Sequence, residues 1–114
     1  MRALLEPVML KRMERRIVRS FLDILILSEL RKRCMSGYDI IAFIHRKFRI
    51  LISSGTVYSL LYSLEREGLI QGRWNQRRRV YSLTEKGEKT IRALQNLNNQ
   101  IKLFVDQCLR CGSE

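Results

Sequence analysis

The sequence predicts a mainly α (α+β) fold in which helices surround a two-stranded hairpin. Residues 53–87 read as a helix that ends at Gly68, a hairpin with a cationic tip and a further capped helix. This is the layout of a winged helix-turn-helix with a two-stranded wing and a long C-terminal dimerisation helix. We expect one compact domain overall, in which residues 1–83 form the winged-helix region with an N-terminal helix and residues 84–114 form the dimerisation helix.

Composition limits the class of protein. A chain of 114 residues with 46% hydrophobic residues can form one domain with a modest core. The 22 Lys and Arg against 11 Asp and Glu give a net charge of +11, which indicates an anionic partner such as a nucleic acid. The longest apolar run, Phe21 to Leu30, contains two acids and is too short to span a membrane. Without a signal-peptide pattern or a disulfide framework, we expect a cytoplasmic protein that does not bind membranes.

The N-terminal half is predicted to contain two helices. Pro7 suits a first helical turn, and apolar residues recur every three or four positions, so we expect one long helix from about Pro7 to Arg33. Ser36 and Gly37 then break the chain and cap a second helix. Its buried face is predicted to consist of Tyr38, Ile40, Ile41, Ile44 and Phe48.

The third helix is predicted to begin after Ser53, whose hydroxyl can accept a hydrogen bond from a free backbone N–H. One side of this helix is apolar and belongs in the core. The opposite face has small residues, hydroxyls and one guanidinium, which suits close approach to DNA phosphates and base edges. We expect DNA contacts from Ser53, Ser54, Gly55, Thr56, Tyr58, Ser59, Tyr62 and Arg66. For the two tyrosines, packing on a neighbouring helix is the alternative.

The hairpin follows Gly68. Residues 69–74 and 79–83 are rich in β-branched and aromatic residues and are predicted to be its strands. No acid stands near the cations of the tip in the sequence, so we expect an unpaired positive prong that contacts DNA phosphates or the minor groove. This prong comprises Arg73, Arg77, Arg78 and Arg79. A solvated turn is the alternative interpretation.

Thr84 is predicted to cap the fourth helix, along which apolar residues alternate in spacings of three and four. This coiled-coil seam consists of Leu94, Leu97, Ile101, Phe104 and Cys108, followed by Cys111. Nothing else in so small a domain can cover so long a stripe, so we expect a second copy of the chain to cover it in a homodimer. Packing of this helix back onto its own domain is the alternative.

The residues do not form an enzyme site. The chain has one histidine, His45, and neither a phosphate-binding glycine loop nor a histidine-based metal motif. We therefore expect no enzymatic activity, no cofactor and no metal site. Cys108 and Cys111 form a C-x-x-C pair that we interpret as small apolar seam residues. A regulator that responds to thiol oxidation or to a metal held by two chains is the alternative.

Several segments resemble the PadR family of transcriptional regulators, over about residues 20–92. They are Leu25-Ile26-Leu27-Ser28-Glu29-Leu30, Ser36-Gly37-Tyr38-Asp39-Ile40, Gly55-Thr56-Val57-Tyr58-Ser59-Leu60-Leu61, Leu64-Glu65-Arg66-Glu67-Gly68-Leu69-Ile70 and Tyr81-Ser82-Leu83-Thr84-Glu85-Lys86-Gly87. The resemblance implies a dimeric winged-helix protein, usually a repressor, that binds palindromic operators in double-stranded DNA. Its DNA contacts come from the third helix and the wing.

The resemblance also has departures. Ser59 stands where many relatives have proline, and the C-terminal region is a single helix rather than a longer helical domain. Family members that bind small aromatic or drug-like inducers do so at the dimer centre, which leaves a small-molecule effector open for this chain.

Together these observations predict a sequence-specific, homodimeric DNA-binding repressor. The third helix should enter the major groove of each half-site, with half-sites about 34–36 Å apart. A non-specific architectural DNA-binding protein would have the same charge and fold, and is the alternative.

Overall fold

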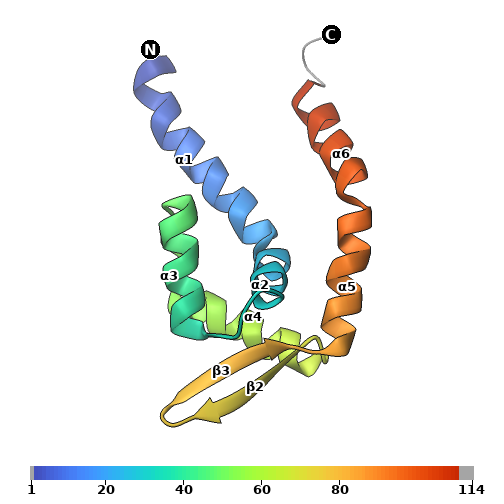
Figure 1. Cartoon of the computed structure of the whole chain (residues 1–114). Helices are drawn as coiled ribbons and strands as arrows, with labels where there is room; N and C mark the ends of the chain where they lie inside the picture. The colour runs from blue at the N-terminus through green and yellow to red at the C-terminus, as the bar shows by residue number, and fades with distance from the viewer. Residues whose placement is uncertain (1, 111–114) are drawn as a thin grey trace.

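The computed structural model describes the backbone of residues 2–110 and the side chains of residues 7–110. Two helical arms rise from a winged-helix body (Figure 1). The elements in chain order are α1 (Arg2–Ser20), α2 (Leu22–Leu30), β1 (Met35–Ser36), α3 (Gly37–Phe48), α4 (Ser54–Arg66), β2 (Ile70–Asn75), β3 (Arg78–Leu83), α5 (Glu85–Asn96) and α6 (Asn98–Arg110). One arm is α1, and the other consists of α5 and α6. The radius of gyration of 16.5 Å exceeds the value of about 13 Å expected of a compact 100-residue domain, because the arms project.

The sheet is antiparallel and has three strands in the order β1-β3-β2. The β2–β3 hairpin, called the wing here, pairs from Ile70 with Leu83 to Asn75 with Arg78. The predicted wing is therefore confirmed, and the two-residue strand β1 adds a third strand beside β3. The sequence did not indicate β1, because two residues are too few to show the alternation of a strand.

The core lies where α2, α3, α4 and the base of the wing meet. Val57 and Leu61 of α4 have 0% exposure, and the sheet adds Ile70 and Tyr81 to the same core. Burial of this side of α4 turns its opposite side to solvent. Further core residues are Leu22, Ile26, Leu27, Leu30, Ile40, Ile44, Ile50, Ile52 and Ile91.

Two of the predicted helices are broken. The expected helix from Pro7 to Arg33 is divided at Phe21, which has φ −110° and ψ 12°. The expected single C-terminal helix is divided at Leu97, with φ −92° and ψ 4°. The break at Phe21 turns α2 into the core, where one side of it is fully buried, whereas α1 stays largely exposed. Neither break contains a glycine or a proline, and the apolar spacing of three and four residues continues through both positions. The sequence therefore predicted continuous helices at both places.

The predicted caps are confirmed. Ser36 Oγ accepts a hydrogen bond from the backbone N–H of Asp39 at 3.1 Å, and Asp39 Oδ2 accepts one from the backbone N–H of Ser36 at 3.0 Å. Ser53 and Thr84 cap α4 and α5 in the same side-chain-to-backbone manner. Gly68 follows α4 with φ 80°, a conformation that glycine adopts without strain.

One predicted core residue is on the surface. Tyr38 was expected in the buried face of α3, but it is 74% exposed. Its neighbours Ile40 and Ile44 are buried, and the rest of the predicted face is half-buried. None of the described helices is both long and apolar enough to cross a membrane.

Two glycines should respond in opposite ways to alanine. A Cβ at Gly87 would overlap the backbone carbonyl oxygen of Leu69 and lie 2.7 Å from a methyl of Leu83, whereas a Cβ at Gly55 would meet nothing within 4 Å. We expect Gly87→Ala to lower the free energy of unfolding by about 1–3 kcal/mol. Gly55→Ala should raise it by up to about 1 kcal/mol, because alanine favours helix. Urea denaturation followed by circular dichroism measures both, and equal effects would contradict the close packing at Gly87.

The stability contributed by Asp39 should depend on pH. Its pKa lies below the ordinary value, mainly because the backbone N–H of Ser36 donates to its carboxylate; the Ser36 hydroxyl and Arg78 also lower this pKa, and burial opposes them. The stabilisation is therefore present at neutral pH and is lost as the pH falls through the folded-state pKa, below about 4. We expect Asp39→Asn to be less stable than the parent at pH 7, with a difference that shrinks at pH 3. Urea midpoints at both pH values test this, with exposed Asp23→Asn as the control for removing a carboxylate.

Candidate nucleic-acid interface

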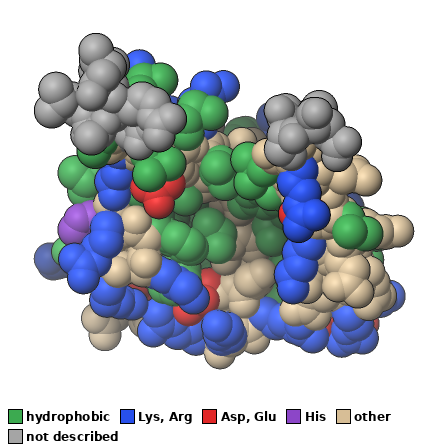
Figure 2. Space-filling view, turned by 90° about the horizontal axis from the view of Figure 1, so that it is seen from above, with side chains coloured by type: hydrophobic (Ala, Val, Ile, Leu, Met, Phe, Trp, Pro, Cys, Tyr) green, Lys and Arg blue, Asp and Glu red, His purple; other side chains and the backbone are tan. Residues whose placement is uncertain are grey.

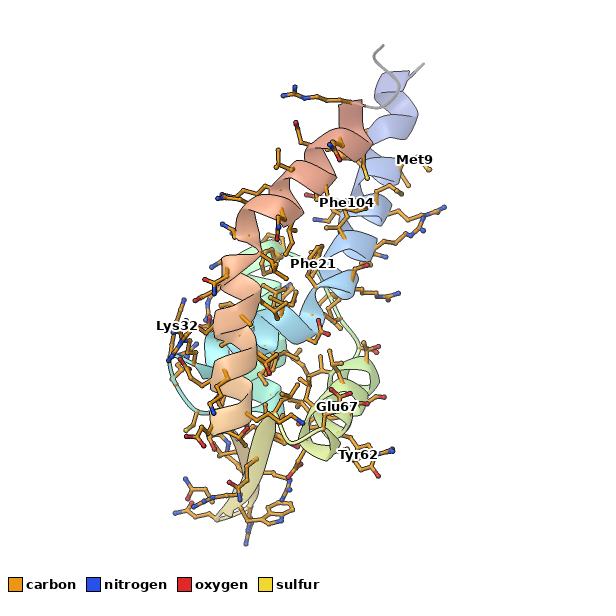
Figure 3. The ribbon with its side chains drawn as sticks, turned by 90° about the vertical axis from the view of Figure 1, so that its right-hand side faces the viewer. Met9, Phe21, Lys32, Tyr62, Glu67 and Phe104 are labelled. Carbon is orange, nitrogen blue, oxygen red and sulfur yellow. The ribbon has the colours of Figure 1, made fainter. Side chains whose placement is uncertain are left out.

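The outer face of α4 is a continuous exposed surface. The face is defined by Ser53, Ser54, Gly55, Thr56, Tyr58, Ser59, Tyr62 and Arg66, all of which are exposed. Figure 3 shows Tyr62 projecting from α4 away from the body. The burial of Val57, Leu61 and Leu64 on the other side of the helix holds this face outward. The structure thus brings together the seven α4 residues and the capping Ser53 that the sequence analysis selected.

The two tyrosines of this face differ in their surroundings. Tyr58 is 47% exposed, and its ring lies against the start of α3, where a Cβ on Gly37 would be 2.5 Å from Tyr58 Cζ. Tyr62 is 64% exposed, and its ring has the Arg66 guanidinium 5.7 Å from its centroid. Tyr58 therefore packs partly on a neighbouring helix, while Tyr62 belongs to the surface.

A groove of about 590 Å³ runs beside the N-terminal half of α4. Arg19, at the end of α1, lines this groove together with the hydroxyl-bearing Ser53, Thr56, Ser59 and Ser63. No acid is among its lining residues, so the groove offers hydrogen-bond donors and one positive charge. The sequence did not place Arg19 beside α4, because only the fold brings the end of α1 there. The sequence signal that could have pointed to Arg19 was the cluster of basic residues along α1.

The tip of the wing is shorter than predicted. The strands extend to Asn75 and Arg78, so only Gln76 and Arg77 form the turn, with Gln76 at φ 62°. Arg73 and Arg77 are exposed, and neither forms an ion pair within residues 7–110.

The other two wing arginines are paired, contrary to expectation. Arg78 Nη2 lies 2.8 Å from Asp39 Oδ2 and donates to Ser36 Oγ at 2.8 Å. Arg79 Nη2 lies 2.8 Å from Glu65 Oε2. The expectation of a wholly unpaired prong was wrong for these two residues, because the acids of α3 and α4 are distant in sequence and reach the wing only in the fold.

A crevice of about 510 Å³ separates α4 from the wing. It is lined by Tyr58, Tyr62, Glu65, Arg66, Arg79 and Tyr81. Its lining includes two guanidinium groups and three tyrosine rings, and its acid, Glu65, is paired with Arg79. The crevice joins the outer face of α4 to the wing as one surface.

The two arms leave apolar side chains uncovered. In the described part of α6 no residue is buried, and Phe104 of the predicted seam is 66% exposed. The α1 arm exposes Val8, Met9, Leu10, Met13 and Ile17. Figure 2 looks into the hollow between the arms, where hydrophobic side chains gather while lysine and arginine lie mainly around the margin. The labelled Met9 and Phe104 belong to the two arms in Figure 3.

At the base of this hollow is a groove of about 400 Å³ between α2 and the second arm. Its lining residues are Phe21, Ile24, Ser28, Ile91, Leu94, Gln95, Asn98 and Ile101. Leu94 also packs on the core of its own chain. For this residue the structure agrees with the alternative interpretation, in which the C-terminal helix packs back onto its own domain. Leu97, Phe104 and Cys108 are exposed instead.

The cysteines do not form a recognisable site in the described part of the chain. Cys34 and Cys108 are exposed free thiols, and Cys111 lies outside the described residues. Among the residues described, no three histidine, cysteine, aspartate or glutamate side chains are grouped to hold a metal ion.

Comparison with known proteins relates this fold to one family. Residues 26–93 match the family described as Transcriptional regulator PadR-like family. A PadR family transcription regulator from hypervirulent Clostridium difficile R20291 is 30% identical with a TM-score of 0.67, over 78% of this chain and 98% of that chain. A PadR family transcriptional regulator from Eggerthella lenta DSM 2243 shares the fold with a TM-score of 0.77 at 24% identity, over 93% of this chain and 96% of that chain.

Bacillus subtilis PadR, solved in complex with operator DNA, is also similar. It has a TM-score of 0.59 and 28% identity, over 65% of this chain and 46% of that longer chain. Comparison with curated proteins gives no match. The family match spans more than half of the sequence, so the chain belongs to the PadR-like family of transcriptional regulators, which are not enzymes.

Proposed function

We propose that the protein is a sequence-specific DNA-binding repressor that acts as a homodimer on a palindromic operator. The outer face of α4 enters the major groove, and the wing lies against the flanking backbone. The observation that carries the proposal is that this exposed face has no acid and is continuous with a cationic wing. The complex of Bacillus subtilis PadR with operator DNA supports it.

Gly55 provides a second argument for DNA contact at the start of α4. Glycine weakens a helix relative to alanine, and nothing in the protein lies where its Cβ would be. The described part of the chain therefore gives no packing reason for glycine here. A close approach of DNA to the helix backbone explains the missing side chain.

The wing arginines divide into two roles in this proposal. Arg73 and Arg77 are free to contact phosphates, which would make binding depend on salt. Arg78 and Arg79 keep their ion pairs with Asp39 and Glu65, and present only the remaining donors of their guanidinium groups to DNA.

The uncovered arms support the proposed homodimer. The apolar residues of α6 and α1 need a partner surface of similar length, and a second copy of the chain offers one in the same two arms. Two copies would place two α4 helices on one duplex, at half-sites about 34–36 Å apart. An effector of small aromatic type, if the protein has one, would occupy the 400 Å³ groove at the base of the hollow.

Operator binding is tested by fluorescence anisotropy at about 0.15 M salt, with the protein's own upstream region and a scrambled duplex. We expect a preference of about 10³-fold or more for the specific site. Gly55→Ala should weaken specific binding about tenfold or more, although it does not lower stability. Equal, steeply salt-dependent affinities for several candidate operators and the scrambled duplex would favour the architectural alternative.

The mass of the protein in solution tests whether the seam on α6 holds two chains together. Phe104→Glu places a charge on the proposed seam, so the protein should change from twice the mass of one chain to a monomer in light scattering. Asn99→Glu adds the same charge to an exposed polar position on the same helix but off the seam, and should leave the dimer intact. A dimer that survives Phe104→Glu would rule out this seam.

A further inference from the structure

The carboxylate of Glu65 contacts both strands of the wing. Glu65 stands in the last turn of α4, and its Oε2 accepts a hydrogen bond from the backbone N–H of Gly72 in β2 at 3.1 Å. The same oxygen accepts from Arg79 Nη2 in β3 at 2.8 Å. One atom therefore connects the helix proposed to read DNA to each strand of the wing beside it.

The surroundings of Arg79 leave little freedom for this contact. Its guanidinium lies 5.8 Å from the ring centroids of both Trp74 and Tyr81. A Cβ at Gly72 would lie 2.6 Å from Arg79 Nε, so a glycine is needed for the arginine side chain to cross β2 and reach Glu65. The hydrogen bonds, the rings and the glycine together define one orientation of Arg79.

The opposite face of the wing has a corresponding contact. Arg78 is adjacent to Arg79 in β3, and successive side chains of a strand point to opposite faces. Arg78 binds Asp39 and Ser36 at the start of α3, while Arg79 binds Glu65 at the end of α4. The wing is thus held from both faces by two different helices.

We propose that Glu65 is a positioning residue that fixes the angle of the wing relative to α4 and thereby promotes DNA binding. The consequence for DNA rests on the proposed function. Charge alone gives the opposite expectation, since an acid beside the interface repels phosphates and its removal should strengthen binding. The sign of the change in affinity therefore distinguishes positioning from simple electrostatics.

Wing order in the free protein is the first test. Trp74 is the only tryptophan of the chain and lies on β2, so time-resolved fluorescence anisotropy of its indole reports motion of the wing. Glu65→Gln removes the ion pair, and Gly72→Ala keeps both charges but blocks the path of Arg79. Both variants should increase the mobility of the indole while the circular dichroism spectrum stays unchanged.

The matched control is Glu67→Gln. Glu67 is exposed, follows directly after α4, and its side chain forms no ion pair among the residues described. The control removes the same charge close to the same helix and should leave the Trp74 anisotropy at the parent value. Indole motion that is equal in the parent, Glu65→Gln and Gly72→Ala would overturn the positioning role.

DNA binding is the second test, with the parent's specific duplex and the scrambled duplex. Glu65→Gln and Gly72→Ala should each lower specific affinity about tenfold or more, whereas Glu67→Gln should remain within about twofold of the parent or bind more tightly. Tighter binding by Glu65→Gln would overturn the proposal in favour of simple repulsion. If the parent itself fails to prefer any specific duplex, the proposed function fails, and the Trp74 measurement still decides whether Glu65 orders the wing.

Discussion

The burial of one side of α4 is the interaction on which the rest of the structure depends. Val57 and Leu61 are fully enclosed by α2, α3 and the base of the wing, which fixes the rotation of α4 about its own axis. That rotation determines which side chains face solvent, and therefore which ones are available to a partner. It also places Glu65 at the edge between the core side and the outer face, within reach of β2 and β3.

Electrostatics has two separate roles in this small basic protein. The excess of lysine and arginine provides a long-range attraction for an anionic partner, which salt screens. Short-range pairs of Arg78 and Arg79 with acids instead set the geometry of the wing. Such exposed pairs contribute little to global stability, so their value lies in orientation. Arg78 and Arg79 in β3 thus orient the wing, whereas Arg77 in the turn contributes to the attraction for an anionic partner.

Sequence reasoning succeeded where the deciding contact is local. Ser36, Ser53 and Thr84 each bond to a backbone N–H three residues ahead, so the sequence contains both partners of the cap. The winged-helix fold and the exposed face of α4 followed from periodicity for the same reason. The break at Phe21 has no local marker. The pairing of the wing arginines depends on contacts between distant segments, as does the place of Arg19 beside α4.

The projecting arms have a consequence for the lifetime of the protein in a cell. In the proposed homodimer, the apolar surfaces of α1 and α6 are covered only while two chains are together, so mass action links their protection to abundance. A scarce protein would spend more time as single chains, whose bare helices are open to proteases and to aggregation. The shape of the arms would thus set a minimum copy number, below which the chain is removed faster than it assembles.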